Sequence, residues 1–184
     1  MTKATMRGTR ALQVCAVTLA LWLTAGPVAA APPAAPPAGK PDPIAEAQRL
    51  ISALSSLREL TRANVEKLLK VSLGPAADFP GDPTLLEAQL PSGPFAKVRL
   101  QQPGPKQTFG PRLGLEARSG TALPRSGFDK ALIGPIVDIN PHIPPEGTVT
   151  HKPAAGDTGT RLEFWTKSEQ LRQVTFSRAP KAGK

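Results

Sequence analysis

The chain has 184 residues and carries 23 Lys and Arg against 14 Asp and Glu, which gives a formal net charge of +9. It contains one cysteine and no tyrosine. A framework of intrachain disulfides is therefore excluded, and a carbohydrate platform built from several aromatic rings is disfavoured.

The first 30 residues have the layout of a secretory signal peptide. Lys3, Arg7 and Arg10 precede an apolar run at residues 12–23, and small residues before Ala31 offer a cleavage site. The run is short for a bilayer span of about 20 residues; an uncleaved anchor is the alternative. Cys15 lies within the run and would leave with it, which excludes thiol catalysis and Cys-based zinc sites in the mature chain. We expect a periplasmic or secreted protein.

The mature chain is expected to have three parts. Residues 31–43 form a Pro/Ala-rich linker with extended, polyproline II character. Residues 44–178 form one domain, with halves at 44–120 and 121–178 if the chain is duplicated, and residues 179–184 form a tail.

Helices are expected at the start of the domain. Apolar residues from Ile44 to Leu60 keep a helical spacing, behind Asp42 as a cap and Pro43 at the first helical position. Thr61 then fits the cap of a second short helix that Gly74-Pro75 ends. One long bent helix is the alternative to two.

Two strands are expected in the middle of the chain. Residues 95–101 (FAKVRLQ) and 112–118 (RLGLEAR) alternate apolar and polar side chains, as half-buried strands do. The Pro- and Gly-rich residues 102–111 form the loop between them. Residues 128–133 are expected to form one or two helical turns.

Further strands are expected toward the C-terminus, at residues 136–139 and 148–151 and in a closing hairpin. The hairpin spans Arg161 to Phe176, with a turn at residues 168–170. We expect its core face to carry Leu162, Phe164, Val174 and Phe176, and its other face to carry Glu163, Trp165 and Arg172. The sequence therefore predicts an α+β fold, in which an N-terminal helix or helix pair packs on an antiparallel β-meander.

No catalytic set emerges from the sequence. His142 and His151 are the only histidines, and neither belongs to a nucleophile elbow or to a metal-binding spacing. Glycine-rich phosphate loops are also absent. We expect no enzymatic activity, no cofactor and no metal.

Two segments share a pattern of cap, short helix and Gly-Pro. They are residues 60–75 (LTRANVEKLLKVSLGP) and 127–135 (GFDKALIGP). With the closing hairpin, this pattern resembles the superfamily of β-lactamase inhibitory proteins and small outer-membrane-assembly lipoproteins. The matching residues, over about half of the mature chain, are Leu60, Thr61, Val65, Leu68, Leu69, Gly74, Pro75, Leu162, Phe164, Leu171, Val174 and Phe176. The chain departs from the family in its short second segment, in the extra residues 70–73, and in lacking a lipobox and disulfides.

The resemblance implies a degenerate duplication and a non-catalytic envelope protein that binds another protein through a sheet. The function expected is an inhibitor- or immunity-like binding module. Because the mature chain would carry a net charge of +6 without Lys3, Arg7 and Arg10, we expect a protein partner with an acidic surface. The expected contact residues are Trp165, Lys167, Arg172, Arg99 and Arg118.

The alternative is a structural accessory factor of envelope assembly, held peripherally on an anionic membrane or on peptidoglycan. Nucleic acid is not expected as a partner, because the chain has neither a basic run nor aromatic platforms. A covered Trp165 that only packs a second small core is the alternative to its role as an anchor.

Overall fold

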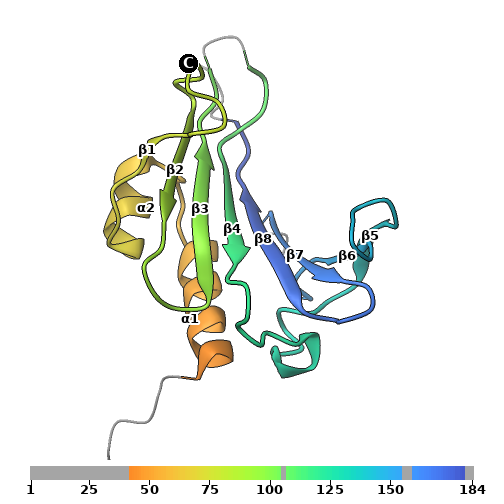
Figure 1. Cartoon of the computed structure of the whole chain (residues 1–184). Coiled ribbons are helices and arrows are strands. Elements are labelled where there is room, and N and C mark those ends of the chain that lie inside the picture. Colours follow the sequence, from red (N-terminus) through yellow and green to blue (C-terminus); the bar gives the residue numbers. More distant parts are fainter. Residues whose placement is uncertain (1–41, 105–106, 155–158, 181–184) are drawn as a thin grey trace, which may run out of the picture. The chain divides into compact units, whose positions relative to one another are not determined.

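The computed structural model describes residues 42–104, 107–154 and 159–180. The expected signal peptide, residues 31–41 of the linker and residues 181–184 of the tail lie outside this part of the chain. The described residues form an α+β fold with an antiparallel sheet of eight strands in the order β1-β2-β3-β4-β8-β7-β6-β5 (Figure 1). The elements are α1 (Pro43–Ser55), α2 (Arg62–Leu69), β1 (Gly74–Pro75), β2 (Leu85–Gln89), β3 (Phe95–Gln101), β4 (Arg112–Ala117), the 3₁₀ turn η1 (Arg125–Gly127), β5 (Ile136–Asn140), β6 (Thr148–His151), β7 (Thr160–Trp165) and β8 (Leu171–Ser177).

The N-terminal apolar stripe forms two helices rather than one bent helix. Asp42 caps α1 by accepting the Ile44 backbone N–H at 3.0 Å, with Pro43 at the first helical position. Thr61 caps α2 by accepting the Asn64 N–H at 3.3 Å. Lys70 ends α2 in the left-handed conformation, with φ of 55°.

No helix within the described residues is both long and apolar enough to cross a membrane.

The hydrophobic core lies between α1 and one face of the sheet. Ala47, Ile51 and Leu54 of α1 are fully buried there. Because side chains alternate along a strand, one face of β3, β4, β7 and β8 points to this core, and a register shift after Phe95 breaks the alternation in β3. The core residues on these four strands include Phe95, Val98, Leu100, Leu113, Leu115, Leu162, Phe164, Val174 and Phe176. Figure 1 shows α1 behind β3 and β4, which leaves the opposite face of these strands toward the viewer.

The hairpin of β7 and β8 has the expected core face, with one change. Strict alternation would place Leu171 on the opposite face from Val174. The β7–β8 register instead shifts between Glu163 and Phe164, so that Leu171 pairs with Phe164 and Gln173 pairs with Glu163. This bulge turns Leu171 into the core, where it is 3% exposed, and leaves Arg172 on the other face.

Two local expectations differ from the structure. Residues 128–133 form a hydrogen-bonded turn closed by the Ile133 N–H and the Asp129 carbonyl, not a helix. Gly134-Pro135 follows directly and ends the segment after one turn. A helix this short cannot add the further hydrogen bonds that would offset the cost of its first turn. Strand β2 was not predicted, because its residues LLEAQ do not alternate in polarity.

The sheet consists of two four-stranded meanders that meet through β4 and β8. Strands β1 to β4 form the first, and β8 to β5 the second. Both helices precede the first meander, whereas η1 precedes the second. The boundary expected near residue 120 falls between β4 and η1; the duplication itself stays a prediction.

Arg178 ties the end of the chain to the end of α1. Its guanidinium donates to the carbonyls of Leu54, Ser55 and Leu57 at 2.8 to 3.2 Å. Helix C-termini leave carbonyls without intrahelical donors, so one side chain satisfies this helix end and closes the sheet against it. Burial lowers the pKa of Arg178. The guanidinium still stays charged at neutral pH, because the ordinary pKa of arginine lies far above 7.

We expect Arg178→Ala to lower the free energy of unfolding by about 1 to 3 kcal/mol, because half-buried carbonyls lose their donor. Urea unfolding followed by circular dichroism measures this. Arg58→Ala is the matched control, since Arg58 is an exposed arginine just after α1, and its unfolding midpoint should stay unchanged. Equal midpoints for both variants would contradict the anchoring role.

Candidate functional site

The candidate site is a groove on the sheet face opposite α1. Two adjoining hollows form it, with volumes of about 750 Å³ and 350 Å³. They share Glu116, Arg172 and Gln173, so they form one depression, which we call the sheet groove. It follows the junction of the two meanders, where β4 lies beside β8.

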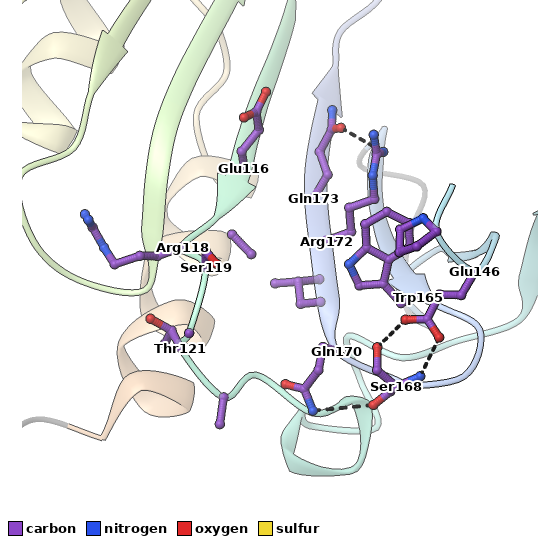
Figure 2. A pocket seen from close by; sticks show the side chains of 15 residues that line it. Glu116, Arg118, Ser119, Thr121, Glu146, Trp165, Ser168, Gln170, Arg172 and Gln173 are labelled. Atoms are coloured by element: carbon purple, nitrogen blue, oxygen red, sulfur yellow. Dashed lines mark hydrogen bonds between the residues drawn. The ribbon is translucent and has the colours of Figure 1, made fainter. Parts of the chain in front are cut away.

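The larger hollow lies where the β4–β8 ladder is interrupted. The last ladder pair is Glu116 with Gln173. The chain then arches away through residues 117–122 and returns where the Leu171 N–H donates to the Leu123 carbonyl at 2.9 Å. Figure 2 shows Glu116, Arg118 and Thr121 on one side of this hollow and Trp165, Arg172 and Glu146 on the other.

The smaller hollow owes its depth to a missing side chain. Gly114 lies in the middle of β4, between Arg112 and Glu116 on the groove face, and lines this hollow. A Cβ atom built there would lie 3.3 Å from Nε2 of Gln173. Any larger residue would therefore fill the floor of the groove.

Trp165 and Arg172 form one wall of the larger hollow. The Arg172 guanidinium lies 5.3 Å from the Trp165 ring centroid, in the range of a cation–π contact. Its Nη1 also donates to both carboxylate oxygens of Glu163 at 3.0 Å. These contacts hold Arg172 over the indole, and Trp165 remains half-buried rather than covered by another element.

Glu146 closes the same side of the groove. Its carboxylate accepts the Ser168 hydroxyl at 2.6 Å and the backbone N–H groups of Lys167 and Ser168 at 2.9 and 3.0 Å. The hydroxyl of Ser168, and then these backbone donors, lower the pKa of Glu146. The contacts fix the β5–β6 loop against the β7–β8 turn, so the wall of the groove is pre-formed.

Arg99 carries an ion-pair network at the far end of the groove. Its Nη2 lies 2.8 Å from Asp78 and 3.0 Å from Glu87, and Glu87 also pairs with Lys97 at 3.2 Å. Glu87 accepts the Ala77 backbone N–H at 3.0 Å as well. That hydrogen bond, followed by the Arg99 contact, lowers the pKa of Glu87 to about 2.

Of the five residues expected to contact a partner, four line the sheet groove and Lys167 does not. Trp165 and Arg172 line the larger hollow, and Arg99 lines the smaller one. Arg118 also lines the groove, but its guanidinium donates to the carbonyls of Leu90, Gly93 and Phe95, which holds the arch to the β2–β3 turn. Lys167 lies exposed on the β7–β8 turn.

Several groove residues were not predicted from sequence. Glu116 and Gln173 face the groove at the last β4–β8 pair, and Glu146 and Gln170 come from separate loops. Alternation along residues 112–118 places Glu116 opposite the core and could have identified it. The loop residues carry no comparable signal, because their positions depend on contacts with distant segments.

The two histidines do not line the groove. His151 is 5% exposed, with Nδ1 2.9 Å from the Gly134 carbonyl oxygen and its ring edge-on to Phe164. His142 lies exposed in the loop after β5. Across residues 42–104, 107–154 and 159–180, no cluster of three or more His, Cys, Asp and Glu is arranged to hold a metal ion.

Comparisons of the chain with protein-family models, curated proteins and solved structures give no match. The resemblance to the superfamily of β-lactamase inhibitory proteins and small outer-membrane-assembly lipoproteins therefore stays a prediction.

The Glu87 network predicts a pH dependence. Unfolded Glu87 titrates near its ordinary value of 4.5 and folded Glu87 near 2, so the unfolded chain binds a proton first as the pH falls. Stability from this group is present above pH 4.5 and is lost between about 4.5 and 2. We expect Glu87→Gln to be less stable at pH 7 and to lose less stability across that window.

Thermal unfolding between pH 2 and 7 measures this difference. Glu116→Gln is the control, because it removes an exposed carboxylate from the same sheet face. A Glu87→Gln variant whose unfolding temperature follows the wild-type pH profile would contradict the assignment.

Proposed function

We propose that this chain is an exported, non-catalytic protein-binding module of the cell envelope, inhibitor- or immunity-like, that binds its partner in the sheet groove. The observation that carries the proposal is a pre-formed groove on an uncovered sheet face, with Trp165 in its wall. Large aromatic side chains beside arginine are typical anchors of protein interfaces. The signal-peptide layout expected from the sequence of residues 1–30 supports an envelope location.

The chemistry of the groove favours binding over catalysis. Its carboxylates are Glu116 and Glu146, and Glu146 is engaged by three donors of the β7–β8 turn. The histidines lie elsewhere, so no imidazole base lies beside the Ser and Thr hydroxyls of the groove. The Ser168 hydroxyl donates to Glu146, in a contact that belongs to the anchoring of the β7–β8 turn. For a partner, the groove instead provides an indole ring to pack against, and side-chain amide and hydroxyl groups that can form hydrogen bonds.

The partner expected is a protein with an acidic surface. Without Lys3, Arg7 and Arg10 the exported chain carries a net charge of +6, which favours such a partner at long range. Within the groove, however, Arg99 and Arg172 already face Glu87 and Glu163. We therefore expect the net charge to speed the encounter and orient the partner. The binding free energy would come mainly from contacts with Trp165 and from the shape complementarity of the groove.

Filling the groove tests the proposal without removing a contact. Gly114→Val places a branched side chain on the groove floor, where the nearest side-chain atom belongs to the flexible Gln173. We expect a folded protein, since valine suits a strand, with capture of the partner from envelope extract at least about tenfold weaker, a loss of about 1.4 kcal/mol. Gly74→Val, in β1 with open space around it, is the matched control and should capture normally.

Trp165→Ala combined with Arg172→Ala should give the same loss. Residues 31–184 contain one tryptophan, Trp165, so its fluorescence reports directly on groove occupancy. If the Gly114→Val variant captures the same partner as Gly74→Val, the groove is not the binding site. Diffuse recovery of envelope material that disappears at moderate salt would favour the accessory-factor alternative.

A further inference from the structure

Two charged side chains on the floor of the sheet groove have no ion-pair partner. Arg112 and Glu116 lie on β4 at either side of Gly114, and both are exposed on the groove face. Arg112 lies over the Phe109 ring, with 5.1 Å between its guanidinium carbon and the ring centroid. Apart from that contact, neither charged group forms an ion pair or a side-chain hydrogen bond with any residue that the structure describes.

The other two arginines of the smaller hollow are drawn away from its floor. Nη2 of Arg99 on β3 binds Glu87 of β2 at 3.0 Å, and Nη1 of Arg172 on β8 binds Glu163 of β7 at 3.0 Å. In the sheet order, β2 and β7 lie on the far sides of β3 and β8 from β4. Both guanidinium groups therefore lean outward, and the two unpaired side chains of β4 determine the charge of the floor.

The backbone of β4 gives the floor a polarity. A strand rises about 3.3 Å per residue, so the Cα atoms of Arg112 and Glu116 lie about 13 Å apart. Gly114 leaves the space between them without a side chain, and the Phe109 ring restricts the guanidinium at one end. The floor is therefore positive where β4 begins and negative where it ends.

Charges of both signs on one floor favour a protein segment over a uniform polyanion. An anionic lipid surface, nucleic acid or an acidic glycan would bring negative charge to Glu116 as well as to Arg112, and like charges across an interface are costly. A polypeptide can carry an acidic and a basic side chain at a set spacing. We propose that the sheet groove binds a segment of the protein partner that places an Asp or Glu carboxylate on Arg112 and a Lys or Arg side chain on Glu116, about 13 Å apart.

This partner chemistry rests on the proposed function of the sheet groove and gives the bound segment a direction. Arg112 can donate two parallel hydrogen bonds to one carboxylate, and no internal carboxylate has to be displaced first. The shape of the groove and the Trp165 contact decide whether a segment fits, and the two β4 charges decide which way it lies. In an extended segment, the required spacing corresponds to about four residues.

Selection of random peptides displayed on phage tests this contact without an identified partner. With residues 31–184 as the bait, we expect enriched peptides to carry an acidic and a basic residue about four positions apart. Trp165 is the one tryptophan of these residues, so its fluorescence measures the affinity of each synthetic, tryptophan-free peptide. Arg112→Glu should weaken that affinity at least about tenfold, because the peptide carboxylate then meets another carboxylate.

Charge reversal at each end of the floor checks the assignment. A new selection on Arg112→Glu should enrich peptides with two basic residues, and a selection on Glu116→Arg should enrich peptides with two acidic residues. Arg58→Glu is the matched control, because it changes the net charge as Arg112→Glu does, from an exposed position outside the groove. At moderate salt its peptide affinities should match those of the unchanged protein within about twofold. Urea unfolding verifies that each variant is folded.

The outcome of these selections separates the charge contact from the groove itself. Peptides that bind Gly114→Val as tightly as the unchanged protein would contradict the sheet groove as a binding site, and the proposed function with it. Peptides that lose affinity for Gly114→Val but not for Arg112→Glu would leave the proposed function standing and overturn the charge contact alone. The charge contact would also fail if no peptide were enriched, or if the enriched peptides were uniformly acidic and phosphatidylglycerol vesicles competed with them.

Discussion

The pairing of β4 with β8 determines both the core and the groove. These strands are distant in sequence, yet Leu113 pairs with Phe176, and Leu115 with Val174, on the side of α1. Because adjacent residues alternate between the faces, the same register places Gly114 and Glu116 beside Thr175 and Gln173 on the other side. A shift by one residue would exchange the two sets. The burial of four core side chains therefore also fixes the groove floor.

The larger hollow follows from the path of the backbone. Between Glu116 and Leu123 the chain leaves β8, and its polar groups need other partners. Arg118 supplies one solution by binding carbonyls of the β2–β3 region, and Gln170 another by accepting the Leu123 N–H at 2.8 Å. These contacts hold the arch open. The hollow is consequently part of the folded framework and needs no ligand to form.

Much of the fold could be predicted from local chemistry. Asp42 and Thr61 act as helix caps because their side chains reach backbone donors two or three residues away. Alternation likewise identified β3, β4 and both strands of the hairpin. What could not be predicted depends on contacts across strands. The bulge that turns Leu171 inward is set by pairing with β7, and β2 has a position in the sheet but no alternation of its own.

The candidate site shows the same division. Alternation was enough to place Trp165 and Arg99 on the face opposite the core. It could not show that Arg118 satisfies backbone carbonyls, since those belong to residues 23 to 28 positions earlier in the chain. Nor could it place Glu146 against the β7–β8 turn.

Internal pairing of Arg99 and Arg172 with Glu87 and Glu163 limits what the charges of these two arginines can contribute to recognition. A partner carboxylate that approached Arg172 would compete with Glu163, which already lies 3.0 Å from it. Exchanging one carboxylate for another gains little free energy, and each removal from water carries a desolvation cost. The Trp165 ring, the amide groups of Gln170 and Gln173 and the floor at Gly114 face no such competition from an internal ion pair. Discrimination between partners would then rest on shape at the junction of the two meanders, with the net positive charge acting mainly on the rate of encounter.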